Sequence, residues 1–102
     1  MSILDPQPAP VNQNSDDVWQ EIIDELPEHL LFLKPICIER REQGIERYGV
    51  PLSRVNGRDH LYDAIQEGLD LAVYMKAADC PDWKEPLETV SSLMWRMSHR
   101  KD

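Results

Sequence analysis

Apolar side chains recur every three or four residues in four stretches of the chain, and no stretch alternates apolar and polar residues as a β-strand would. These stretches predict helices over residues 16–26, 36–48 and 60–75 and from Pro86 onward, with a loop over residues 49–58. Ser15 is the expected N-cap of the first helix, Asp59 is the expected N-cap of the third, and Gly49 is expected to end the second. Residues 28–33 form a segment too short to classify. The pattern therefore predicts an all-α fold, a small helical bundle.

The stretch over residues 57–75, which contains the third expected helix and its cap, has a narrow acidic stripe in apolar surroundings. Its acidic residues fall within an arc of roughly 80° at 100° per residue, and they are Asp59, Asp63, Glu67 and Asp70. Most of the remaining circumference is apolar, so we expect this helix to be buried on most sides. No Lys or Arg lies between Arg58 and Lys76, and a divalent cation such as Mg²⁺ could neutralise the stripe. A solvated acidic face is the alternative.

A second acidic strip lies on the helix expected over residues 36–48. Glu39, Glu42 and Glu46 fall within an arc of roughly 60°, although arginines alternate with them as on an ordinary solvated helix. Two consecutive helices joined by a short loop tend to pack antiparallel, which could bring two carboxylate pairs together. The four residues are Glu39, Glu42, Glu67 and Asp70. Such a pocket of oxygen ligands would suit Mg²⁺, with Mn²⁺ as the alternative.

Length and charge narrow the choice of partners. The 102 residues predict one helical domain over residues 15–102, after a proline-rich tail over residues 1–14. A net charge of -8 argues against a nucleic-acid polymer or an anionic membrane as partner.

Cys37 and Cys80 lack metal-ligand spacing, and no membrane span or signal peptide is evident, so we expect a cytoplasmic protein with free thiols. The broad apolar arc over residues 61–75 predicts a homodimer or a homotetramer.

The acidic spacing resembles that of a known enzyme family. Glu39-x-x-Glu42, followed about 24 residues later by Glu67-x-x-Asp70, is similar to the signature of the MazG-like all-α nucleoside triphosphate pyrophosphohydrolases. The segments QGIERYGVPL and NGRDHLYDAIQEGLDLAVYM resemble short phage members of this family, the MazZ type, which act on purine deoxynucleotides. The resemblance covers about residues 36–76. It departs from the family pattern at Ile38, where a glutamate is expected, and Asp63 or Glu46 could compensate.

The resemblance implies hydrolysis of a nucleoside triphosphate, with dGTP or dATP favoured, to the monophosphate and pyrophosphate by a metal-activated water. Glu39, Glu42, Glu67 and Asp70 would be the catalytic metal ligands. Arg58 and Arg47 are the expected phosphate contacts, and Trp19 and Asn56 are the candidates for contacting the base, although an aromatic residue on an apolar helix face, such as Trp19, is usually a core residue. If the protein is phage-encoded, it would act in the host cytoplasm.

Two other functions remain open at this point. A non-enzymatic helical module would present the acidic stripe to a basic partner, and it would gain no stability from Mg²⁺ or Mn²⁺. An inactive relative would bind nucleotides without cleaving them, as the departure at Ile38 allows. Analysis of the nucleotide products separates these alternatives from the enzyme.

Overall fold

The computed structural model describes residues 16–100, which divide into two compact units at Asp59. We call residues 16–58 the N-terminal unit and residues 59–100 the C-terminal unit, and each is described by itself. Over the described residues the chain forms four α-helices and one 3-10 helix, with no strand. The predicted all-α class is therefore confirmed. None of the described helices has the length and apolar character needed to cross a bilayer.

The N-terminal unit packs helix α2 (Lys34–Tyr48) against α1 (Val18–Glu25) and the 3-10 helix η1 (Glu28–Leu33). The segment that the sequence left unclassified is thus η1, which leads directly into α2. Helix α2 ends at Gly49, whose φ of 82° is the left-handed conformation that glycine adopts readily. The predicted end of the second helix is confirmed, and its start lies two residues before residue 36.

The start of α1 differs from the prediction. Asp17, and not Ser15, is the N-cap, because its side chain accepts a hydrogen bond from the Gln20 backbone N–H at 3.1 Å. Asp and Ser are about equally good caps, so the sequence alone did not decide between them. Ser15 and the predicted tail lie outside the described residues.

The segment after α2, residues 49–58, returns along the start of α1. The Val18 N–H donates to the Leu52 carbonyl oxygen at 2.9 Å. The guanidinium of Arg54 forms ion pairs with Asp16 and Glu21. These contacts fix the loop beside α1, and Arg54 is therefore occupied in holding the unit together.

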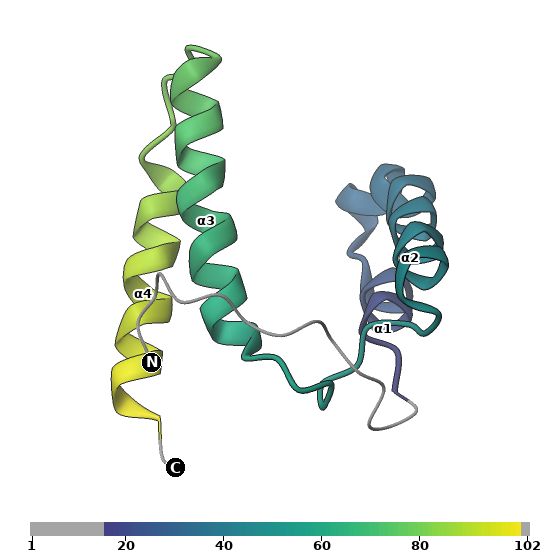
Figure 1. Ribbon diagram of the computed structural model, residues 1–102. Coiled ribbons are helices and arrows are strands. Elements are labelled where there is room, and N and C mark those ends of the chain that lie inside the picture. The colour runs from purple at the N-terminus through teal and green to yellow at the C-terminus, as the bar shows by residue number, and fades with distance from the viewer. Residues whose placement is uncertain (1–15, 101–102) are drawn as a thin grey trace. The chain divides into compact units, whose positions relative to one another are not determined.

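The C-terminal unit is a hairpin of two helices, α3 (His60–Ala77) and α4 (Glu85–His99), which lie side by side in Figure 1. Asp59 is the N-cap of α3, as predicted, and accepts from the Tyr62 N–H at 3.1 Å. Arg100, just after α4, forms an ion pair with the same carboxylate. That guanidinium lowers the pKa of Asp59, with a further contribution from the capping hydrogen bond. The role of Asp59 is therefore structural.

Helix α3 is only partly buried within one chain. Tyr62, Ile65 and Ala72 are buried, but Val73 is 64% exposed and Tyr74 is 71% exposed. One chain therefore leaves much of the apolar arc uncovered, and its burial in an oligomer stays a prediction. A hairpin of two helices can cover only one side of α3 within this unit.

Candidate functional site

Two carboxylate pairs lie on exposed helix faces. Glu39 and Glu42 are on α2, and Glu67 and Asp70 are on α3. Residues three apart on a helix are neighbours on one face, and all four residues are exposed. The first pair belongs to the N-terminal unit and the second to the C-terminal unit. Their meeting around a metal ion therefore stays a prediction.

The exposure of these carboxylates changes the electrostatic argument. Like charges one turn apart on a solvated helix repel by only a few tenths of a kcal/mol, so either pair is compatible with folding without a cation. Over residues 16–100, no three His, Cys, Asp or Glu side chains are grouped as a metal-binding cluster would require. Each pair nevertheless offers the oxygen ligands that Mg²⁺ uses, since this ion commonly takes one or two carboxylates and keeps several waters.

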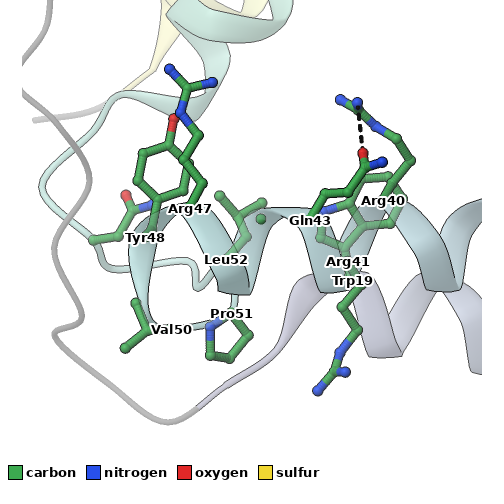
Figure 2. Close-up of a pocket in the computed structure, with 11 residues that line it drawn as sticks. Trp19, Arg40, Arg41, Gln43, Arg47, Tyr48, Val50, Pro51 and Leu52 are labelled. Atoms are coloured by element: carbon green, nitrogen blue, oxygen red, sulfur yellow. Dashed lines mark hydrogen bonds between the residues drawn. The ribbon is translucent and has the colours of Figure 1, made fainter.

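A pocket of about 300 Å³ lies on another face of α2. Its walls are α2, the side chain of Trp19 from α1, and residues 50–52 and 56 of the following loop (Figure 2). Three of the predicted nucleotide contacts line it: Trp19, Arg47 and Asn56. The fourth, Arg58, is not among its lining residues, and neither Glu39 nor Glu42 lines it.

Helix geometry explains which residues of α2 reach the pocket. Arg40, Gly44 and Arg47 are spaced by four and three residues and therefore share a face. Figure 2 shows the side chains of Arg40 and Arg47 extending to the same side of α2, at the two ends of the pocket. The Arg47 guanidinium lies over the Tyr48 ring at 5.3 Å. Arg40 Nη1 donates to Gln43 Oε1 at 3.4 Å, so neither cation is neutralised by these neighbours.

Arg41 also lines the pocket, but its charge is compensated. Its Nε and Nη2 atoms donate to Asp17 Oδ2 at 2.9 and 2.7 Å, which ties α2 to the first turn of α1. The hydrogen bond from Arg41 is the main cause of a lowered pKa for Asp17, and partial burial opposes it. Asp17 therefore caps α1 and positions Trp19, two residues later, beside α2.

Asn56 is the buried polar group of the pocket. It is 3% exposed, and its Oδ1 accepts the Arg58 backbone N–H at 3.1 Å. This bond fixes the amide, and Nδ2 has no hydrogen-bond partner among the described residues. A buried donor without an acceptor costs about 1–3 kcal/mol. The amide of Asn56 is thus fixed in the wall of the pocket, with Nδ2 itself enclosed by other atoms.

Sequence reasoning missed Arg40 and Gln43 as pocket residues. Gly44 is a further lining residue, and a glycine inside a helix, which costs about 1 kcal/mol relative to alanine, often marks the close approach of another backbone or of a ligand. A Cβ built at Gly44 would meet no atom within 4 Å, so no described backbone approaches it. Gly44 instead forms part of the pocket floor and leaves space there for a ligand.

Comparisons of the chain with protein-family models, with curated proteins and with solved structures found no match.

Proposed function

We propose that this protein is a metal-dependent nucleotide pyrophosphohydrolase of the MazG-like kind, cleaving purine (deoxy)nucleoside triphosphates to the monophosphate and pyrophosphate. The substrates we favour are dGTP and dATP, in phage nucleotide metabolism. The observation on which this rests is the presence of two exposed carboxylate pairs with the same three-residue spacing on α2 and α3. The pocket with Trp19, Arg40 and Arg47 on another face of α2 is a second support, for the binding of a phosphorylated aromatic ligand.

In this proposal the carboxylates of Glu39, Glu42, Glu67 and Asp70 hold Mg²⁺ or Mn²⁺. The bound ion would supply a water activated for attack on phosphorus. Arg58 and Arg47 would place positive charge at the phosphates, where negative charge accumulates as the pyrophosphate leaves. A homodimer or homotetramer would cover the apolar residues that α3 leaves exposed in one chain.

The direct test is to incubate the full chain with each nucleoside triphosphate and Mg²⁺ and to identify the products. We expect the monophosphate and pyrophosphate from a purine substrate. Release of orthophosphate, or no turnover of any nucleotide, would contradict the proposal.

A variant at the carboxylates sharpens this test. Glu67→Gln removes one charge with almost no change in volume, so turnover should be lost while the helical content stays that of the wild type. Glu88→Gln on α4 is the matched control, because Glu88 is also exposed and lies outside both pairs. Wild-type rates in Glu67→Gln would remove Glu67 from the site.

One observation favours a second candidate, a non-enzymatic helical interaction module. Val73, Tyr74 and Trp95 expose 64, 71 and 62% of their surface, and exposed apolar residues are common where proteins associate. This module would gain no thermal stability from Mg²⁺ or Mn²⁺. A metal site predicts a melting temperature that rises with ion concentration.

A further inference from the structure

Among the described residues, the pocket on α2 adjoins the carboxylate pair of the same helix only through Gln43, whose Nε2 donates to Glu39 Oε1 at 3.4 Å, and no acidic residue lines it. At 100° per residue, Gly44 lies about 140–160° around the helix axis from Glu39 and Glu42. The pocket is also formed entirely within the N-terminal unit. It can therefore bind a ligand without the acidic residues and without a metal ion.

The charge at the rim of the pocket favours an anion. Arg40 and Arg47 are exposed, and over the described residues neither forms an ion pair with a carboxylate. In a chain of net charge -8, two such arginines at one pocket are a local exception. Guanidinium groups bind phosphate through paired, charge-assisted hydrogen bonds.

The remaining walls favour a flat ring. Trp19 lines the pocket, and planar rings stack favourably on aromatic side chains. Asn56 also lines the wall, and its amide is held in place by the bond from the Arg58 N–H to Oδ1. A volume of about 300 Å³ is at the small end for ligand pockets. A flat ring and an anionic group in a pocket of this size together describe a mononucleotide.

We propose that this pocket binds a nucleoside monophosphate without a metal ion, with the base against Trp19 and Asn56 and the phosphate at Arg40 and Arg47. The proposal deepens the proposed function, because both use Trp19, Asn56 and Arg47 to contact a nucleotide. It requires neither the carboxylate pairs nor hydrolysis. The two proposals can therefore fail separately.

The experiment is calorimetric titration of the full chain with GMP in the presence of EDTA, with guanosine and inorganic phosphate as separate probes. We expect GMP to bind at least tenfold more tightly than either probe, because each probe satisfies only part of the pocket. Binding should weaken as salt is added, since the rim arginines are exposed. Absence of GMP binding, binding only when Mg²⁺ is present, or equal binding of phosphate alone would overturn the proposal.

Two variants localise the site. Gly44→Leu places a side chain in space that is free of neighbouring atoms, so the fold should persist while GMP binding falls at least tenfold. Arg40→Gln should also weaken GMP binding severalfold. Arg96→Gln, which removes an exposed arginine of α4, is its matched control and should leave binding unchanged. Wild-type affinity in Gly44→Leu, with its helical content intact, would refute the assignment to this pocket.

The outcomes also separate the two proposals. If GMP binds in EDTA but no triphosphate is hydrolysed with Mg²⁺, the pocket proposal stands and the enzyme proposal fails. If triphosphates are hydrolysed but Gly44→Leu binds GMP as the wild type does, the enzyme proposal stands and the pocket proposal fails.

Discussion

Replacing Gly68 by alanine tests how closely α3 and α4 pack. A Cβ built at this glycine would lie 2.5 Å from Val90 Cγ2, well inside the roughly 3.5–4.0 Å at which carbon atoms attract. Val90 is 4% exposed, and a branched valine side chain has one strongly preferred rotamer in a helix. The methyl group therefore cannot turn aside easily, and one of the two helices must shift.

The expected size of the effect follows from two opposing contributions. Overpacking in a core costs about 1–3 kcal/mol, while the better helix propensity of alanine returns about 1 kcal/mol. We expect Gly68→Ala to lower the free energy of unfolding by up to about 2 kcal/mol. Gly44→Ala is the matched control, because its Cβ would meet no atom within 4 Å. That variant should be more stable than the wild type by up to about 1 kcal/mol.

Urea unfolding followed by circular dichroism measures both variants, and the midpoint shifts at constant slope give the differences. Val90→Ala completes a double-mutant cycle, since it removes the methyl group that the new Cβ would meet. In that background Gly68→Ala should cost less than in the wild type. Equal stabilisation by Gly68→Ala and Gly44→Ala, or a cycle without coupling, would refute the close packing of α3 on α4.

Two further predictions concern charge and association. Because Arg41 lowers the pKa of Asp17, the carboxylate stabilises the fold above its unfolded pKa of about 4, and this stability is lost as the pH falls through the lower folded value. Asp17→Asn keeps a capping oxygen, so it should cost about 1 kcal/mol at neutral pH and progressively less as the pH falls below the unfolded pKa. A difference that does not change with pH would contradict the ion pair. Light scattering should show at least a dimer that Val73→Asp weakens, and a monomeric wild type would contradict this.

Local rules were sufficient to predict most of the helices from the sequence. The left-handed end of α2 at Gly49 and the cap of α3 at Asp59 each depend on one residue and its immediate neighbours. Local rules did not determine the N-cap of α1, because Ser and Asp, the residue types at positions 15 and 17, are equally suitable as N-caps. The burial of α3 could not be read residue by residue for another reason. An apolar arc shows which side chains could be covered, and only the packing partner decides which of them are.

Three residues of the pocket could be chosen from the sequence, but the pocket as a surface could not. Trp19, Arg47 and Asn56 were chosen by residue type, and they line one pocket because the loop after α2 returns along α1. That return depends on contacts such as those of Arg54 with Asp16 and Glu21, which are 38 and 33 residues away in sequence. Spacing patterns along one helix contain no information on such distant pairs.

The charges of α2 show most clearly how a linear pattern misleads. In sequence, its arginines alternate with glutamates, which is typical of a solvated helix whose charges neutralise one another. At 100° per residue, the angular positions of Arg40 and Arg47 around the axis of α2 differ by about 20°. Both arginines lie roughly 120° around the axis from the direction midway between Glu39 and Glu42. The alternation therefore separates into a basic face that borders a pocket and an acidic face that does not line it. One helix can thus offer phosphate contacts on one side and cation ligands on another, and for this reason the binding of a mononucleotide and the binding of Mg²⁺ should respond to different substitutions.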